Sequence, residues 1–588
     1  MLDVIIDNID VWTSAQTPKI SGGRGRSKKG TQTAYGIKKS RALILELAVL
    51  GKLVPQNPND ESASELLKKI ADERNDFIKK GRIKKQKPIT PLSEIEKEIV
   101  LPRGWAVEKF GNLAIIERGG SPRPINSYLT NDPNGLNWIK IGDTDIGGKY
   151  IHSTAEKIIE EGLSKTRMVY PGDFLLTNSM SFGRPYITKI KGCIHDGWLR
   201  ISPATLVDKD YLYWLLSSPY VVNAFKDSVS GAVVQNLNSD KVREVAILIP
   251  PINEQHRIVS KVDELMALCD QLEQEQTDNN AAHQTLVETL LGTLTESVDN
   301  KELQENWSRI ENHFDTLFTT EHSIDQLKQT ILQLAVMGKL VPQDPNDEPA
   351  RVLLEKITNE KKLLIKEKQI KKQKPLTPIT EDEKLFELPS GWEFSRIGDA
   401  SLFSEYGVSA KTYDDIGGIP VLKMGDIQQG RVLLGRQKEA STDFDGISEL
   451  MLKHGDVLYN RTNSAELVGK TGRFDGADDK YSFASYLIRI RCSENNVTSK
   501  YLNTFMNSSL FRKTQIEPHL KQQCGQANVN GTVMKGMIVG IPPLAEQNRI
   551  VVKVDELMAL CDNLKVKINE VQTTQTHLTD AIVEEAVR

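Results

Sequence analysis

The sequence of 588 residues predicts an α+β protein in which two similar globular domains are separated by long antiparallel helices that resemble a coiled coil. Three observations lead to this fold class: duplicated flanking elements, a heptad spacing of apolar residues within them, and two intervening modules rich in turn residues. Because the same flanks bracket both modules, we expect a pseudo-twofold tandem repeat with its two termini close together.

The first flanking element lies before each module. Residues 44–60, ILELAVLGKLVPQNPND, return at 331–347 as ILQLAVMGKLVPQDPND, and the same offset of 287 places LPRGW on LPSGW. We therefore expect an N-terminal helical region with a basic arm and linker at 1–105. The second copy of this flanking element stands at the end of an expected central helical region, also with a linker, at 249–392.

The second flanking element lies after each module. Residues 249–273 return at 541–565 with 19 of 25 positions identical. Their apolar residues alternate spacings of four and three, which predicts amphipathic helices that need a helical partner, the second continuing through 541–588. Double prolines stand just before both expected helix starts, where a missing amide hydrogen costs nothing. The apolar positions are Ile258, Val262, Leu265, Cys269 and Leu272, and then Ile550, Val554, Leu557, Cys561, Leu564, Ile568 and Val571.

Between the flanks lie the two modules, residues 106–248 and 393–540. Both are dense in Gly, Pro, Asn and Ser between short apolar runs such as NWIKI and YLIRIR. This pattern is typical of short strands joined by tight turns. Sparse matches such as KIGD and KMGD indicate related but different modules, and we expect each to be an α+β domain.

Composition and motifs exclude most enzymatic roles. The five cysteines are too far apart for a zinc knuckle, and SAELVGKT at 464–471 has a serine where a phosphate loop needs its first glycine. We predict no catalytic, metal or cofactor site in this chain. With 39% hydrophobic and 26% charged residues and no apolar run near the ~18 of a membrane helix, a cytoplasmic protein without membrane contact is expected.

The twice-occurring LP-GW before a variable module and IPP-x-x-EQ-x-RIV-x-KVDELMALCD after it resemble the DNA specificity (S) subunits of type I restriction-modification systems. The similarity covers nearly the whole chain, and the long region before the first module resembles the branch with a long N-terminal region. The resemblance implies that 106–248 and 393–540 are target-recognition domains, each reading one half of an asymmetric bipartite DNA sequence.

The same resemblance implies the partners. Two methyltransferase (M) subunits dock on the helical regions and supply S-adenosylmethionine chemistry, while restriction (R) subunits join the assembly and supply ATP- and Mg-dependent translocation and cleavage. The chain would be required for both methylation and restriction without reacting itself. The outward acidic residues Asp263, Glu264, Asp555 and Glu556 are candidates for the M-subunit contact, although the sequence favours a solvated face somewhat more than a docking site.

Loops rich in Arg, Asn and Gln are the candidates for base contacts, because Arg pairs with guanine and Asn or Gln with adenine in the major groove. Ordinary turn residues remain the alternative at each position. In the first module the candidates are Arg118, Ser121, Arg123, Asn126, Asn178, Ser179, Arg184, Gln235 and Asn236. In the second they are Lys411, Asn460, Arg461, Asn463, Gln522, Gln523, Gln526 and Asn528.

Lysine and arginine clusters lie outside the modules. Residues 11–41 hold eight basic residues and no acid, and similar runs occupy 74–88 and 361–374. They suit phosphate contact or solvated linkers. Two other functions stay open: a fused restriction methyltransferase, which S-adenosylmethionine binding would reveal, and a helical scaffold tethering two protein-binding domains, which would not bind DNA.

Overall fold

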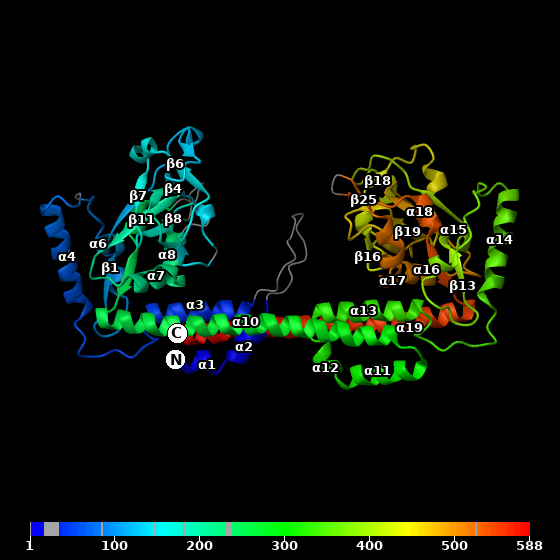
Figure 1. Ribbon diagram of the computed structural model, residues 1–588, viewed down its shortest axis with the longest axis horizontal. Helices are drawn as coiled ribbons and strands as arrows, with labels where there is room; N and C mark the ends of the chain where they lie inside the picture. The colour runs from blue at the N-terminus through cyan, green and yellow to red at the C-terminus, as the bar shows by residue number, and fades with distance from the viewer. Residues whose placement is uncertain are drawn as a thin grey trace. The chain divides into compact units, whose positions relative to one another are not determined.

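The computed structural model describes residues 2–16, 34–83, 86–145, 147–179, 183–229, 237–523 and 526–588. The chain divides into two compact units: unit 1 is Met1–Asn279 with Glu570–Arg588, and unit 2 is Asn280–Asn569. Each unit combines one domain of strands and short helices with a layer of longer helices (Figure 1). The predicted α+β class is confirmed. Within the described residues, no helix has the length and apolar character needed to span a bilayer.

Unit 1 is built on α3 (Tyr35–Val49), the first part of α10 (Ile252–Glu296) and the end of α19 (Leu544–Val587). Arg41 on α3 forms ion pairs of 2.5 Å with Asp270 and 2.6 Å with Glu273, both on α10. The heptad residues of α10 face this core, and the N-terminal helices α1 (Leu2–Ile6) and α2 (Ile9–Ser14) share it with the last turns of α19. Ile258, Val262, Leu265 and Cys269 are at most 3% exposed.

Unit 2 repeats this arrangement with α13 (Glu321–Val336), the first part of α19 and the last turns of α10. Lys328 pairs with Asp562, and Asp325 pairs with Lys565, so α13 and α19 run antiparallel. Ile550, Val554 and Cys561 are buried as the heptad predicts. The heptad fails at Val571, which is 56% exposed, because beyond residue 569 the helix belongs to unit 1 and buries another face there.

Both long helices begin directly after the double prolines, as predicted. The remaining helices of the two layers and their connections are α4 (Ala63–Lys79) and α5 (Glu94–Lys97) in unit 1, and α11 (Asn300–Asn312), α12 (Phe314–Leu317) and α14 (Ala350–Lys366) in unit 2.

The domain of unit 1 contains two five-stranded sheets, in the orders β2-β11-β8-β9-β5 and β3-β6-β4-β10-β7, and a β1-β12 pair. The bounds of the first sheet are β2 Ala114–Arg118, β11 Trp198–Pro203, β8 Phe174–Thr177, β9 Pro185–Thr188 and β5 Tyr150–Ile151. Those of the second are β3 Leu129–Thr130, β6 Glu156–Ile158, β4 Leu136–Ile139, β10 Gly192–Ile194 and β7 Arg167–Val169. The pair is β1 Ala106–Lys109 with β12 Ala246–Ile249, and the helices are α6 Phe110–Leu113, α7 Lys209–Ser217, α8 Pro219–Val229 and α9 Ser239–Arg243.

The domain of unit 2 has the same central strands inside a six-stranded sheet of order β14-β23-β19-β21-β17-β16. Its bounds are β14 Phe403–Tyr406, β23 Leu487–Arg491, β19 Val457–Asn460, β21 Thr471–Arg473, β17 Arg431–Val432 and β16 Ile427–Gln428. Two three-stranded sheets are β18 Glu439–Ala440, β15 Ile419–Leu422 and β22 Ser482–Phe483, and β20 Thr462–Asn463, β25 Gln526–Asn528 and β24 Lys521–Gln523. The pair is β13 Glu393–Arg396 with β26 Ile538–Ile541, and the helices are α15 Ile397–Ala400, α16 Ser499–Met506, α17 Ser509–Phe511 and α18 Gly531–Gly536.

The repeated motifs of the flanks form the same buried connection in each unit. In unit 1 the indole Nε1 of Trp105 donates to Glu254 Oε1 at 3.1 Å, and Gln56 donates to the same oxygen at 3.3 Å. In unit 2 Trp392 donates to Glu546 Oε2 at 3.0 Å. Both glutamates are 1% exposed, and burial raises the pKa of each. The near-identical sequence therefore fixes how each domain joins its long helix.

Replacing Trp105 by phenylalanine is expected to lower the free energy of unfolding of unit 1 by about 1.5–3 kcal/mol, because the buried carboxylate of Glu254 loses a donor. Trp392→Phe should cost unit 2 a similar amount. Thermal unfolding followed by the circular dichroism of the backbone, a signal that does not depend on tryptophan, measures both losses of stability. Trp214→Phe is the matched control, because its partner Asp263 lies on the surface. An equal loss in all three variants would contradict the role of the buried bond.

Candidate nucleic-acid interface

In unit 1, polar side chains from two separate segments, residues 118–123 and Asn178, meet at the turn 195–197, which precedes β11. Ser121 Oγ donates to Asp196 Oδ1 at 2.8 Å, and Arg118 Nε donates to the Asp196 carbonyl at 3.2 Å. Asn178 Nδ2 donates to the same carbonyl at 2.9 Å. The guanidinium of Arg123 lies 3.6 Å from Asp196 Oδ2. Four of the residues predicted from the sequence therefore surround one aspartate that the sequence prediction did not include.

In unit 2 the equivalent turn, 484–486, precedes β23. Arg461 Nε donates to the Ser485 carbonyl at 2.8 Å, and the Arg461 guanidinium lies over the ring of Tyr406, 5.0 Å from its centroid. The Tyr406 hydroxyl in turn accepts from Gly531 N at 2.7 Å. Arg461 is therefore held at its Nε and against an aromatic face.

The two turns have matching backbone contacts. Asn178 N donates to the Gly197 carbonyl at 2.9 Å, as Arg461 N donates to the Tyr486 carbonyl at 3.1 Å. Leu237 N donates to the Asn178 carbonyl and Val529 N to the Arg461 carbonyl, each at 2.9 Å. Asn178 and Arg461 thus occupy the same place in the two domains.

A glycine precedes each candidate loop because the backbone comes very close to the turn. A β-carbon at Gly119 would lie 2.3 Å from the His195 carbonyl oxygen, and one at Gly407 would lie 2.1 Å from the Phe483 carbonyl oxygen. Both distances are far below contact, so only glycine fits. The two domains hence bring their loops to the turn in the same way.

The ionisation of Asp196 follows from its neighbours. Burial alone would raise the pKa of this carboxyl, but the hydrogen bond from Ser121 and the charges of His195 and Arg118 outweigh it, and the pKa is lowered. Asp196 is therefore a carboxylate at neutral pH, and its side chain is 36% exposed. Turn 195–197 offers hydrogen-bond acceptors, whereas turn 484–486 offers the donors of Arg461.

Comparison with known proteins gives the family. The model of the type I restriction modification DNA specificity domain matches residues 102–281 and 389–573. The chain is 37% identical to the type I restriction enzyme EcoEI specificity subunit of Escherichia coli, covering 99% of both chains. It is also 37% identical to the EcoAI specificity subunit of Escherichia coli, again over 99% of both. The chain belongs to the type I restriction-modification specificity family.

A solved structure from work on the complex assembly and conformational transition of the type I R-M system aligns with a TM-score of 0.48 at 17% sequence identity. The alignment covers 83% of this chain and 99% of that one. Membership in the family makes this protein a DNA specificity subunit of a type I restriction-modification system.

The remaining candidate residues of this specificity subunit are spread over the two domains. Asn460 is 1% exposed at the end of β19, as buried as Asn178. Gln235 and Asn236 lie outside the described residues, and only the backbone is described for Gln522, Gln523 and Gln526. Asn126, Arg184, Lys411 and Asn528 are exposed, while Ser179 and Asn463 are partly exposed.

Sequence reasoning missed three residues of the candidate interface: Asp196 and Ser485 of the turns, and Tyr406 of β14. Asp196 is 75 residues from Ser121 in sequence, and Tyr406 is 55 residues from Arg461. No local motif links such partners. Aligning the two modules on the glycine pair Gly119 and Gly407 would have placed Arg118 on Tyr406 and given one sequence signal for the site.

The four acidic residues predicted to contact an M subunit lie on the long helices. Asp263 accepts from Trp214 Nε1 at 2.9 Å, and Glu264 pairs with Lys261 at 2.7 Å. Glu556 pairs with Lys553 at 3.1 Å, and Asp555 lies 3.8 Å from Lys500. All four remain exposed, so they are available for a partner.

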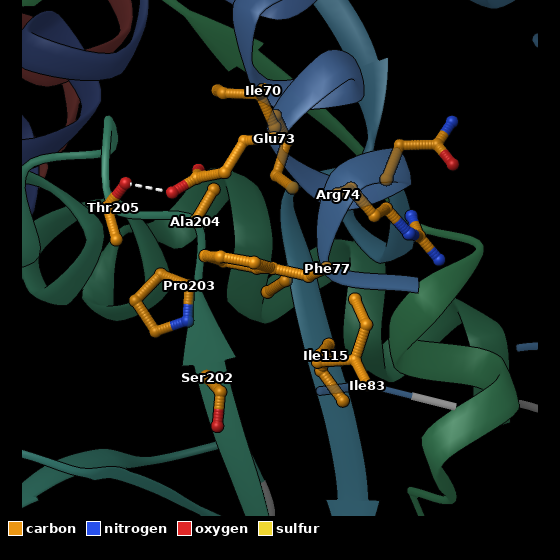
Figure 2. Close-up of a pocket in the computed structure, with 13 residues that line it drawn as sticks. Ile70, Glu73, Arg74, Phe77, Ile83, Ile115, Ser202, Pro203, Ala204 and Thr205 are labelled. Carbon is orange, nitrogen blue, oxygen red and sulfur yellow. Dashed lines mark hydrogen bonds between the residues drawn. The ribbon is translucent and has the colours of Figure 1, made fainter. Parts of the chain in front are cut away.

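A pocket of about 200 Å³ lies between helix α4, the start of β2 and the end of β11 (Figure 2). These strand ends are the ones away from turn 195–197. Ile70 and Phe77 of α4 face Ile115 and Pro203 across it, and Glu73 bonds to Thr205. Arg74 Nη1 donates to the Gly111 carbonyl at 2.9 Å; at the offset of 287, Lys361 Nζ donates to the Gly398 carbonyl at 2.6 Å. We call α4 and α14 the arm helices. The pocket thus belongs to a contact between arm helix and domain that is repeated in the two units, and it lies apart from the candidate interface.

Proposed function

We propose that this specificity subunit reads an asymmetric bipartite target in double-stranded DNA, one half with residues 106–248 and the other with residues 393–540. One observation carries the proposal: the turns 195–197 and 484–486 have matching backbone contacts but different side chains. A common scaffold that presents different donors and acceptors suits two different half-sites. The candidate residues of both modules are the proposed DNA-binding residues, and Asn178, whose amide is buried, takes part by positioning the first turn.

We further propose that the helical regions fix the spacing between the half-sites and dock two M subunits. Each copy of the repeated flank offers the same surface, which fits two copies of one partner. Asp263 with Glu264, and Asp555 with Glu556, are the proposed contact residues. The M subunits supply S-adenosylmethionine chemistry and the R subunits supply ATP- and Mg-dependent cleavage, in the cytoplasm, while this chain performs no reaction. Both methylation and restriction depend on its target choice.

Mapping of N6-methyladenine in cells that express this chain with its M partner tests the proposal. The expected result is methylation at one motif made of two unlike half-sites with an unread gap of constant length. Cells with the M subunit alone are the control and should show no such motif. A palindromic or continuous motif would contradict the assignment of one half-site to each domain.

A further inference from the structure

We propose that Asp196 and Arg461 are specificity-determining residues of the two domains, and that they select opposite base chemistry. Asp196 accepts a hydrogen bond from an exocyclic amino group, that of adenine or cytosine, in the half-site of the first domain. Arg461 donates to the O6 and N7 acceptors of guanine in the half-site of the second. The inference rests on the proposed function and adds to it which base chemistry each domain selects.

Arg461 is pre-organised to donate. Its Nε is used by the Ser485 carbonyl at 2.8 Å, and its guanidinium plane rests on Tyr406, which is itself fixed by its bond from Gly531 N. Among the described residues, its terminal nitrogens Nη1 and Nη2 make no hydrogen bond. Two parallel N–H donors in a fixed plane match guanine, the commonest partner of arginine in the major groove.

Asp196 is arranged to accept. Its Oδ1 accepts from the Ser121 hydroxyl at 2.8 Å, which sets the orientation of the carboxylate, and among the side chains that the structure describes Oδ2 has only the long 3.6 Å contact with Arg123. The Arg123 side chain is 83% exposed, so it can turn to a phosphate when DNA binds. An ionised carboxylate has no donor; it therefore attracts the amino groups of adenine or cytosine and repels guanine O6 and thymine O4.

The matched positions make the contrast sharp. Where the second domain has Arg461, the first has Asn178, whose amide is buried and already bonded to the Asp196 carbonyl. Where the first domain has Asp196, the second has Ser485, whose carbonyl is bonded to Arg461. At these two matched positions the charged side chain is therefore acidic in the first domain, where Arg118 and Arg123 lie beside it, and basic in the second. Asn178 is a positioning residue of the first turn.

The test combines variants with base-resolved methylation mapping of the assembled complex. Arg461→Lys should reduce discrimination at one guanine of the second half-site by about 10-fold to 100-fold and leave the first half-site unchanged. Asp196→Asn should relax one adenine or cytosine position of the first half-site and leave the second unchanged. Arg351→Lys and Asp72→Asn, both exposed on arm helices, are the matched controls.

The wild-type protein gives a second readout that needs no substitution. Binding of the wild-type complex to duplexes with 7-deazaguanine at each guanine in turn should weaken at least 10-fold at one guanine of the second half-site. Purine in place of adenine, or a pyrimidine without the amino group in place of cytosine, should do the same at one position of the first.

The outcomes separate this inference from the proposed function. A wild-type map without a bipartite motif would refute the proposed function. A bipartite motif whose second half-site lacks guanine, or whose base preferences stay the same in both variants while methylation falls evenly, would overturn the inference alone. Tolerance of every base analogue by the wild-type complex would overturn it too, whether or not the variants fold.

Discussion

Replacing Asp456 by alanine is expected to destabilise unit 2 by roughly 3–5 kcal/mol, the usual cost of removing one partner from a buried ion pair. The Asp456 side chain is 1% exposed and takes two bonds from Arg491, Nε to Oδ1 at 2.7 Å and Nη2 to Oδ2 at 2.6 Å. Arg489 lies beside it and also pairs with Glu405. Burial and Arg491 lower the pKa of Arg489 to about 9, so Arg489 stays charged at pH 7, and both arginines would lose their shared carboxylate.

Asp173 gives the matched control, because it occupies the same Gly-Asp turn before β8 in unit 1. Its carboxylate accepts from Tyr170 N at 2.9 Å, as Asp456 accepts from Lys453 N at 2.8 Å. No arginine bond to Asp173 occurs within the described residues, since Ser202 stands on β11 where β23 has Arg491. Asp173→Ala should therefore cost about 1 kcal/mol. Urea denaturation monitored separately for each domain compares the two alanine variants. Equal losses of unfolding free energy would show that the Gly-Asp turn, rather than the ion pair, accounts for the stabilisation.

Much of the fold could be predicted because the signals for it are local. The heptad residues Ile258 and Ile550 are buried, and the helices start directly after their double prolines. The KIGD and KMGD matches form the same turn, in which Asp143 and Asp426 accept from Lys140 N and Lys423 N at 2.7 Å. Each of these features depends on residues only a few positions apart, so periodicity and turn chemistry suffice to find it.

The candidate site was predictable only in part, because its partners come from distant strands. Loop composition pointed to Arg118 and Arg461, but which side chains meet them depends on strand register. The antiparallel pairing of β11 with β2 sets Leu199 opposite Arg118 and carries turn 195–197 to that strand end. Burial was equally hidden: Asn178 and Asn460 look like loop residues in the sequence, yet each is 1% exposed. A one-residue change of register would have gathered different side chains.

Repeat detection also missed one element of the helical layers. In unit 1, α2 precedes α3 and buries Trp12 in the core. In unit 2, α12 precedes α13 and buries Leu317 in the core. The sequences of α2 and α12 share little beyond an Asp and apolar spacing. Packing needs only an apolar residue at this place, so the position is repeated while the residue is not.

Truncation of the chain after Asn569 is expected to destabilise unit 1 strongly while unit 2 keeps its fold. Residues 570–588 form the last turns of α19 and belong to unit 1. Ala586 is buried in its core, with Ile582, Val583 and Val587 packed against it. Asp580 accepts from Tyr35 at 2.8 Å and pairs with Lys39 at 2.7 Å, and Lys52 Nζ donates to the Val587 carbonyl at 2.7 Å.

The free energy of unfolding of unit 1 is expected to fall by about 4 kcal/mol or more. Burying one large apolar side chain contributes about 1.5–3 kcal/mol, and the truncation removes the four apolar residues of α19 that pack in this core. Hydrogen exchange of the α3 amides should then accelerate by about a thousandfold, at about 1.4 kcal/mol per tenfold change, while the amides of α13 and β19 keep their protection. Leu578→Ser, at a position 47% exposed, is the control and should leave both units unchanged. Unaltered exchange in α3 after truncation would mean that the end of α19 is not part of the unit 1 core; faster exchange in both units would mean that they unfold together.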